Sequence, residues 1–280
     1  MSADGTLFLR VDGRDVDHGA AAVMASDRGL SYGDGVFRTV LLRGGRVAAW
    51  PRHVQKLGID LARLGLGPPD LPRITADLAQ LGARHPDCVV RITLTAGASV
   101  RGYRRARDTP LTTIMRATAI PAWPVDVAHH GIELRLCSLR LAEQPVLAGV
   151  KHLNRLEQVL ARAEWDDERI PEGLTLDSAG HAICGTMSNL FILEAGRLAT
   201  PDLTRCGVEG VQRSRILDWA RRRGIPASVE RLPLGRVCAA DGLILCNSVI
   251  GAWWVNRFHG RSYPRPAWHG ELTADLERDD

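Results

Sequence analysis

Two lysines carry the most chemical information in this chain, because arginine supplies almost all of its other positive charge. Lysine and arginine together number 36, and only Lys56 and Lys151 are lysines. A partly desolvated lysine can lose its proton and react with a carbonyl carbon, whereas arginine stays protonated. The residue types therefore indicate covalent chemistry at one or both positions. Composition alone favours the plainer interpretation that two lysines survived a drift toward arginine.

Two glycine-containing segments could build a site around such an amine. Residues 26–37 contain three glycines, which is typical of tight turns or close backbone approach. Residues 207–214 read Gly-Val-Glu-Gly-Val-Gln-Arg-Ser and open an expected helix, whose first N–H groups can bind a phosphate. Asn247 and Ser248 end an apolar run, where a strand would meet a cleft. Each feature alone is equally well an ordinary turn, helix start or strand end.

The elements expected around these residues alternate between strands and helices. In the first half, apolar periodicity and turn residues predict strands at 36–42, 46–50, 88–95 and 111–117 and helices at 51–65 and 71–81. In the second half they predict strands at 132–138, 174–177, 190–193, 197–200, 226–230 and 242–247, and helices after Lys151 and at 211–222. The polar tail after residue 263 is expected to be peripheral.

A proline-containing segment divides the chain, because each proline restrains itself and its predecessor. We therefore expect an N-terminal α+β domain at 1–118, a linker at 119–126, and a C-terminal α/β domain at 127–280 that carries the reactive lysine. A cleft is expected between the two domains.

Composition excludes several classes of partner. With 45% hydrophobic and 24% charged residues the chain is typical of globular domains. The net charge of +4 is small for 280 residues, so we expect no nucleic-acid partner. No apolar run approaches the roughly 20 residues that span a bilayer, and no signal pattern opens the chain, so we expect no membrane partner. The six cysteines show no metal-ligand spacing, which predicts no metal site and a reducing, cytoplasmic location.

Taken together, five motifs distributed along the chain resemble one family. They are Asp27-Arg-Gly-x-x-Tyr-Gly-Asp-Gly-Val-Phe37, His53-x-x-Lys56-Leu57, Lys151 with Asn154, Ser188-Asn-Leu-Phe191 and Gly207-Val-x-Gly-Val211. In this combination the chain resembles the fold-type IV pyridoxal-phosphate enzymes over residues 5–255. That family includes branched-chain and D-amino-acid aminotransferases and 4-amino-4-deoxychorismate lyases. The run 147–160 and Arg101-Gly-Tyr103 resemble the lyases.

The resemblance implies a role for each matching residue. Lys151 would be catalytic and would bind pyridoxal 5'-phosphate covalently through its amine. The residues implied around the cofactor are Lys56, Lys151, Cys184, Gly210, Val211, Gln212, Asn247 and Ser248. The residues implied around the substrate are Tyr32, Arg101, Tyr103 and Asn154. The planar fork of Arg101 suits a carboxylate.

Two positions depart from the family pattern. Lys56 stands where the family usually has an arginine on the cofactor phosphate, and a lysine supplies the charge without the bidentate geometry. Cys184 stands where a glutamate usually faces the pyridine nitrogen, and a neutral thiol cannot keep that nitrogen protonated in the same way. Either the cofactor withdraws enough electron density without the carboxylate, or its weakening disfavours transamination while permitting elimination.

The resemblance implies a homodimer that acts on a small molecule. The implied reaction is elimination from 4-amino-4-deoxychorismate to give 4-aminobenzoate and pyruvate. The alternatives are a D-amino-acid or branched-chain aminotransferase of the same fold, and a homologue that binds the cofactor without turnover.

Overall fold

The computed structural model describes residues 5–17, 19–106, 109–123 and 127–278. Contacts between Cα atoms divide the chain into two compact units. The first contains residues up to 121 together with Val150–Asn154, and the second contains Ala122–Gly149 and Arg155–Arg278. Lys151 therefore packs with the first unit, whereas the predicted C-terminal domain included it. The reason is local: Val150 is buried in the same apolar core as Val36. Residues 124–126 of the predicted linker lie outside the described residues.

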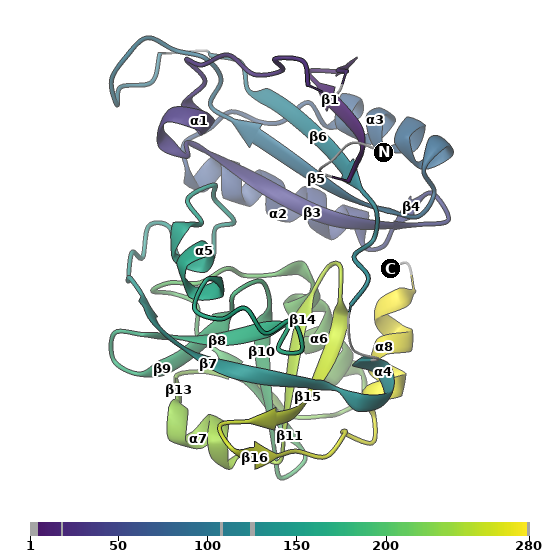
Figure 1. The fold of residues 1–280 in the computed structure, drawn as a ribbon, viewed down its shortest axis with the longest axis vertical. Coiled ribbons are helices and arrows are strands. Elements are labelled where there is room, and N and C mark those ends of the chain that lie inside the picture. The colour runs from purple at the N-terminus through teal and green to yellow at the C-terminus, as the bar shows by residue number, and fades with distance from the viewer. Residues whose placement is uncertain (1–4, 18, 107–108, 124–126, 279–280) are drawn as a thin grey trace. The chain divides into compact units, whose positions relative to one another are not determined.

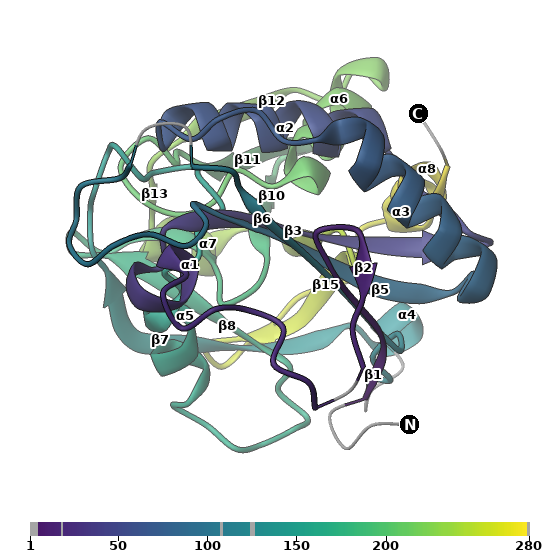
Figure 2. The ribbon, with the colours of Figure 1, turned by 90° about the horizontal axis from the view of Figure 1, so that it is seen from above.

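The first unit is a six-stranded sheet with helices α2 and α3 on one face (Figures 1 and 2). The sheet order is β2-β1-β6-β5-β3-β4. The elements of this unit are β1 (Thr6–Val11), β2 (Arg14–Asp15), α1 (Arg28–Tyr32), β3 (Gly35–Arg43), β4 (Arg46–Val47), α2 (Trp50–Arg63), α3 (Leu71–Arg84), β5 (Cys88–Thr95) and β6 (Thr112–Thr118). The structure confirms the predicted hairpin, both longer helices and both later strands. The strand expected at 46–50 is wrong at its end: β4 stops at Val47, because Trp50 and Pro51 already form the first turn of α2. The short helix α1 was not predicted, because the segment reads as a glycine-rich turn.

Alternation along the strands decides which residues of the first unit face the helices. Val36, Val40 and Leu42 of β3 lie in one core with Leu57 and Leu61, which are one turn apart on α2. A strand turns successive side chains to opposite faces, so Phe37 lies on the other face of the sheet. The side chains at the start of β3 therefore alternate between the core that the helices cover and the opposite face of the sheet.

The second unit is built on a ten-stranded sheet in which six strands close into a ring. The main order is β12-β11-β10-β14-β15-β7-β8-β9-β13, and β9 also pairs with β10 through Cys184 and Asn189. The ring therefore runs β10-β14-β15-β7-β8-β9, a barrel-like closure that leaves these strands no open edge at that point. The strands are β7 (Ile132–Leu141), β8 (Glu172–Asp177), β9 (His181–Gly185), β10 (Asn189–Glu194), β11 (Arg197–Pro201), β12 (Ala227–Glu230), β13 (Leu232–Pro233), β14 (Gly242–Asn247), β15 (Gly251–Phe258) and β16 (Arg261–Ser262).

Helices cover the outside of this strand system. They are α4 (Val127–His130), α5 (Leu156–Arg162), α6 (Val211–Arg222), α7 (Leu234–Ala239) and α8 (His269–Glu277). Leu272 and Leu276 of α8 are buried against Ile216 and Trp219 of α6. The expectation of a peripheral tail after residue 263 is therefore wrong, because two leucines one turn apart give that polar segment an apolar stripe.

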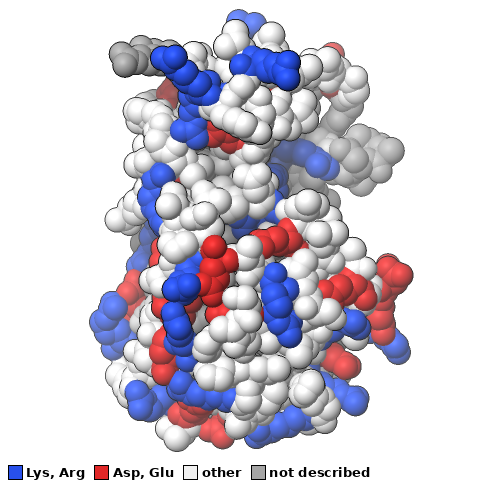
Figure 3. All heavy atoms as spheres, turned by 90° about the vertical axis from the view of Figure 1, so that its left-hand side faces the viewer, with Lys and Arg blue, Asp and Glu red and all other residues white. Residues whose placement is uncertain are grey.

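Charges of both signs lie close together on the surface. Figure 3 shows Lys and Arg side chains intermingled with Asp and Glu over much of the face in view. Across the described parts of the chain, no helix is both long and apolar enough to cross a bilayer.

Candidate active site

Lys151 lies on a short extended segment that adds to the beginning of β3. The N–H of Phe37 donates to the carbonyl oxygen of Lys151 at 3.0 Å, and the N–H of Leu153 donates to the carbonyl oxygen of Gly35 at 3.0 Å. His152 pairs with Val36 as an isolated bridge. These contacts fix the main chain on both sides of Lys151.

The amine of Lys151 lies over an aromatic ring. Its Nζ is 4.4 Å from the centroid of the Phe37 ring, and the Cζ of Arg91 is 3.8 Å from the same centroid. A cation near the face of an aromatic ring is attracted by the electrons of that face. Phe37 therefore helps to orient the Lys151 side chain.

Lys56 belongs to a buried group of charges on the helix-covered face. Its Nζ donates to Oδ1 of Asp60 at 2.6 Å, and the side chain of Asp60 is fully buried. Arg38 of β3 donates to Oδ2 of the same carboxylate. The predicted phosphate ligand is thus held in place by an acid that the motif analysis did not single out.

Tyr32, Arg101, Tyr103 and Asn154 gather around the glycine-rich segment. The Oη of Tyr32 accepts a hydrogen bond from the N–H of Gly102 at 3.2 Å, and the rings of Tyr32 and Tyr103 are 5.5 Å apart. Arg101 and Tyr103 are exposed. Their side chains are therefore accessible to a solute, as a substrate-binding role requires.

Asn154 uses its amide to hold the turn at Gly33. Its Nδ2 donates to the carbonyl oxygen of Gly33 at 3.2 Å. Gly33 has φ of 64°, and a Cβ there would lie 2.3 Å from Oδ1 of Asn154, so this turn requires glycine. The substrate role of Asn154 stays a prediction beside this structural contact.

A buried acid clamps the loop that carries Arg101 to the glycine-rich segment. Asp34 accepts from Nε of Arg28 at 2.8 Å and from Nε of Arg105 at 2.9 Å. Arg28 also donates to the carbonyl oxygens of Gly102 and Tyr103. Burial alone would raise the pKa of Asp34, but the hydrogen bonds from Arg105 and Arg28 hold it below its ordinary value. The carboxylate therefore stays charged and keeps the loop attached.

In the second unit, the predicted phosphate turn opens helix α6. Gly210 is the residue before the helix, and, within the residues that the structure describes, no side chain caps it. Asn189 holds the turn from the side: its Oδ1 accepts from the N–H of Gly210 at 3.1 Å, and its Nδ2 donates to the carbonyl oxygen of Val208 at 2.8 Å. The first N–H groups of a helix have no partner inside the helix. The N–H groups of Val211 and Gln212 can therefore donate hydrogen bonds to an anion.

A buried carboxylate shapes the connection between β9 and β10. Glu172 is 0% exposed. It accepts hydrogen bonds from N–H and Oγ1 of Thr186 at 2.8 and 2.5 Å, from N–H of Met187 at 3.1 Å and from Oγ of Ser188 at 2.7 Å. A Cβ on Gly185 would lie 2.6 Å from Oε2 of Glu172, so the turn leaves no room for a side chain there. Glu172 thus fixes the connection that joins Cys184 to Asn189.

Cys184 lies in β9 among apolar side chains and neutral polar groups. It is 6% exposed and packs in a cluster with Ile183, Leu203 and Cys206. Its Sγ is 3.6 Å from Oγ1 of Thr175, and that hydroxyl donates to the carbonyl oxygen of Cys184 at 2.8 Å. The position therefore presents a thiol beside a hydroxyl rather than a carboxylate.

Asn247 and Ser248 end strand β14. The Oδ1 of Asn247 accepts from the N–H groups of Val249 and Ile250 at 2.8 and 3.0 Å, and its Nδ2 donates to the carbonyl oxygen of Met187 at 3.1 Å. Ser248 is half-buried in the turn that follows. The side chain of Asn247 therefore stabilises this turn, and its predicted cofactor contact stays a prediction.

The structure distributes the predicted site residues equally between the units. The first unit contains Tyr32, Lys56, Arg101, Tyr103, Lys151 and Asn154, and the second contains Cys184, Gly210, Val211, Gln212, Asn247 and Ser248. Sequence reasoning missed the residues that hold these in place, namely Arg38, Asp60 and Glu172. Asp60 carried a weak signal, because it follows Lys56 by one helical turn.

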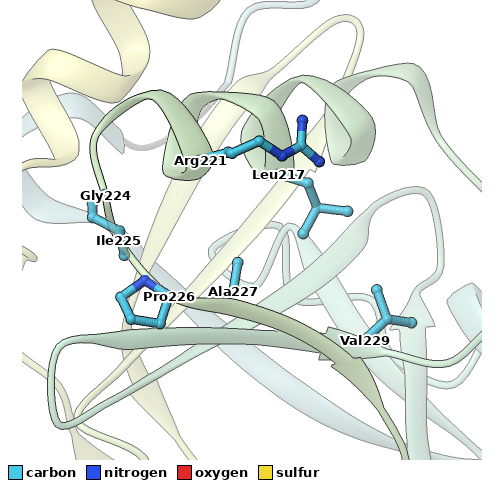
Figure 4. Close-up of a pocket in the computed structure, with 7 residues that line it drawn as sticks. All are labelled: Leu217, Arg221, Gly224, Ile225, Pro226, Ala227 and Val229. Carbon is cyan, nitrogen blue, oxygen red and sulfur yellow. The ribbon is translucent and has the colours of Figure 1, made fainter.

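A separate cavity in the second unit contains none of the predicted residues. It is lined by Leu217, Arg221, Gly224, Ile225, Pro226, Ala227 and Val229, from the end of α6 and from β12 (Figure 4). Arg221 is the one charged residue of this lining, and it pairs with Asp218 at 2.6 Å. Among the described residues that line it, none has a nucleophilic or acidic side chain.

Comparison with known proteins decides the family. The model described as Amino-transferase class IV matches residues 35–258. The chain belongs to the class IV aminotransferase family. This family member is 33% identical over 256 residues to the aminodeoxychorismate lyase of Vibrio harveyi, which covers 91% of this chain and 94% of the relative. It is 30% identical to a putative branched-chain-amino-acid aminotransferase of Methanocaldococcus jannaschii, over 97% of this chain and 94% of the relative.

A solved structure agrees with the fold of this class IV family member. The crystal structure of 4-amino-4-deoxychorismate lyase from Pseudomonas aeruginosa matches with a TM-score of 0.89 and 38% identity. The match covers 96% of this chain and 97% of that one. The predicted α/β fold class and the resemblance to fold-type IV enzymes are confirmed.

Proposed function

We propose that this protein is a pyridoxal 5'-phosphate-dependent 4-amino-4-deoxychorismate lyase that forms 4-aminobenzoate and pyruvate. The observation that carries the proposal is Lys151, one of only two lysines in the chain, with its main chain fixed against β3 and its amine oriented over Phe37. The Vibrio harveyi and Pseudomonas aeruginosa relatives, at 33% and 38% identity, both have the lyase name.

The donor set of the protein fits the cofactor. A phosphate needs hydrogen-bond donors and positive charge. The start of α6 has such donors in the second unit, and Lys56 has the positive charge in the first. An aldehyde needs an accessible primary amine, which Lys151 provides. Val211 and Gln212 would hold the phosphate through their N–H groups, while Cys184 would face the pyridine ring. When bound, the cofactor supplies an electron sink for the carbon that bears the substrate amine.

In the proposed reaction, Lys151 acts as a positioned general base. Its amine accepts the proton from the ring carbon that bears the substrate amine. The enolpyruvyl oxygen leaves the neighbouring ring carbon with the bonding electron pair, and the ring becomes aromatic. The released enolpyruvate takes up one proton and becomes pyruvate. Arg101, which is exposed on the loop clamped by Asp34, would bind a substrate carboxylate through its planar guanidinium.

Cys184 favours elimination over transamination in this proposal. A carboxylate at this position would keep the pyridine nitrogen protonated, whereas the thiol and its neighbour Thr175 are neutral hydrogen-bonding groups. Elimination ends in an aromatic product, so it depends less on a strongly stabilised carbanion. A weaker electron sink therefore costs the lyase reaction less than it costs amino transfer.

The test is formation of 4-aminobenzoate by the purified protein supplied with pyridoxal 5'-phosphate and 4-amino-4-deoxychorismate. We expect product from the native chain and none from Lys151→Ala. The control is Lys56→Arg, which replaces the other lysine but keeps its positive charge. A yellow protein that binds the cofactor but makes no 4-aminobenzoate would refute the lyase. Amino transfer from a D- or branched-chain amino acid would then support the second candidate, which the Methanocaldococcus jannaschii relative favours.

We further propose that the protein is a cytoplasmic homodimer. All six cysteines are free, as is usual in a reducing compartment. Helix α5 exposes Leu156, Val159 and Leu160, an apolar patch that a second copy would cover. Light scattering during size-exclusion chromatography would test the dimer, and a mass equal to one chain of 30.6 kDa at micromolar concentration would refute it.

A further inference from the structure

Asp60 is an acidic residue buried beside apolar side chains. It lies on α2 with its side chain fully buried, one residue from Leu61 and three from Leu57 of the apolar core. Moving a carboxylate out of water costs several kcal/mol unless charges and hydrogen bonds compensate it. Its position therefore depends on the groups that it binds.

Three groups from different parts of the first unit bind this carboxylate. Lys56 donates to Oδ1 at 2.6 Å, and Arg38 donates to Oδ2. The backbone N–H of Lys151, 91 residues away along the chain, also donates to Oδ2 at 3.1 Å. Both lysines of the chain therefore contact the same carboxylate, one through its ammonium and the other through its main chain.

The order of residues on α2 shows that the pair is not mainly a helix-stabilising device. Lys56 precedes Asp60 by four residues, and lysine before an acid is the weaker orientation for such a pair on a helix surface. The pair is also buried, with the Lys56 side chain 13% exposed. The contact instead restricts a flexible side chain that would otherwise have many rotamers.

Two cations share the carboxylate of Asp60. Arg38 and Lys56 bring two positive charges and Asp60 brings one negative charge. Burial lowers the pKa of Arg38, and the attraction of Asp60 offsets only part of that effect. Asp60 therefore draws both cations to one point of the first unit.

We propose that Asp60 is a positioning residue that fixes the ammonium of Lys56 and the main chain of Lys151 relative to each other. The inference rests on the proposed function, in which Lys56 meets the cofactor phosphate and Lys151 meets its aldehyde. A lysine lacks the rigid planar geometry of an arginine, so its charge has no fixed direction. Asp60 fixes that direction by binding the ammonium of Lys56. One carboxylate thus sets the spacing between the phosphate contact and the reactive amine.

The two lysines make a direct test practical. Reductive methylation of the cofactor-free protein with 13C-formaldehyde gives NMR signals from Lys56, Lys151 and the N-terminal amine, and the variants Lys151→Ala and Lys56→Arg assign them. In Asp60→Asn we expect the Lys56 signal to move toward that of a free methylated lysine. The matched control is Asp77→Asn, which removes another buried acid, paired with Arg10 at 2.6 Å on the neighbouring helix α3.

Two aldehydes separate the two contacts of Asp60. Pyridoxal 5'-phosphate uses both lysines, whereas pyridoxal lacks the phosphate and reports on Lys151 alone. After borohydride reduction and peptide mass spectrometry, we expect Asp60→Asn to lower the affinity for pyridoxal 5'-phosphate about tenfold, because a hydrogen bond to a charged group is lost. We expect it also to slow the capture of pyridoxal at Lys151 about threefold. Asp77→Asn should change neither.

The inference is overturned if the Lys56 signal and the capture of pyridoxal are both unchanged in Asp60→Asn. It is also overturned if only the phosphorylated aldehyde is affected, or if Asp77→Asn gives the same losses. Should Asp60→Asn fail to fold, Arg38→Met with Asp60→Asn keeps the same net charge and must show the same two losses. None of these readouts needs 4-amino-4-deoxychorismate, so the lyase assignment can fail while this inference stands, and the reverse.

Discussion

Replacing Glu172 by glutamine tests the most densely bonded acid of the second unit. The carboxylate accepts five hydrogen bonds, from Gly173, Thr186, Met187 and Ser188, three at Oε1 and two at Oε2. Glutamine has nearly the same shape, but its NH2 group cannot accept a hydrogen bond. The replacement therefore changes the hydrogen-bonding pattern without opening a cavity.

The loss of stability depends on which hydrogen-bond donors lose their acceptor. If NH2 replaces Oε2, the hydroxyl of Ser188 can rotate and accept, but the N–H of Met187 cannot and is left without an acceptor. A buried donor without a partner costs about 1–3 kcal/mol, and the remaining bonds lose the strength that a charged acceptor gives them, about 1 kcal/mol in total. We expect the free energy of unfolding to fall by about 2–4 kcal/mol.

Urea unfolding of the cofactor-free protein at pH 7 measures this difference, with Glu168→Gln as the control. Glu168 is exposed, so its replacement should change the free energy of unfolding by less than about 0.5 kcal/mol. Because the loop leads to Asn189, which holds the turn before α6, Glu172→Gln should also weaken binding of pyridoxal 5'-phosphate. A Glu172→Gln protein as stable as the control would refute the role given to this carboxylate.

Other contacts of the structure can each be tested by a substitution or a labelling experiment. Cys184→Glu should raise half-transamination with an amino acid about tenfold, because a carboxylate strengthens the electron sink, and unchanged or lower transfer would refute the role of the thiol. Asp34→Asn should cost about 2–4 kcal/mol at pH 7, because it leaves a buried arginine without its acid. Since the folded-state pKa of Asp34 lies below its ordinary 3.8, this stabilisation is complete above pH 3.8 and disappears as the pH falls through the folded-state value. A difference between Asp34→Asn and native protein that stays constant in urea titrations from pH 7 to pH 3 would contradict that. Burial raises the pKa of the Cys246 thiol to about 12, so this thiol forms little reactive thiolate at pH 8. A thiol reagent at pH 8 should therefore label about one cysteine in the native protein, the half-buried Cys238, and all six after unfolding. Arg215→Met should lower the free energy of unfolding by about 2–4 kcal/mol, since the buried guanidinium donates to backbone carbonyl oxygens at the end of α8; loss of less than 1 kcal/mol in urea would argue against it.

Local sequence patterns determined most of the elements of the first unit. Leu57 and Leu61 recur at helical spacing and predicted α2, and the Gly44-Gly45 turn predicted the hairpin of β3 and β4. These signals are local, because a helix buries one stripe of its own side chains and a tight turn needs glycine at its own positions. The same reasoning failed for α8, since two buried leucines in a polar tail are a weak signal.

The sequence did not predict that the strands of the second unit close into a ring. Cys184 and Asn189 are five residues apart, but only their pairing shows that β9 returns to β10 and completes the ring. Strand pairing depends on which segments meet in space, and each strand alone has the same alternating pattern whichever neighbour it takes.

The amino-acid sequence was enough to predict the candidate reactive lysine, the glycine-rich segment, a helix start suited to phosphate and the motifs of one enzyme family. Residue types and short spacings decide those features. The contacts that hold these features in place are visible only in the folded chain, because Asp60 of α2 binds the N–H of Lys151 across 91 residues and binds Arg38 of β3. A buried charge is stable only beside partners of opposite charge, and folding alone brings those partners together.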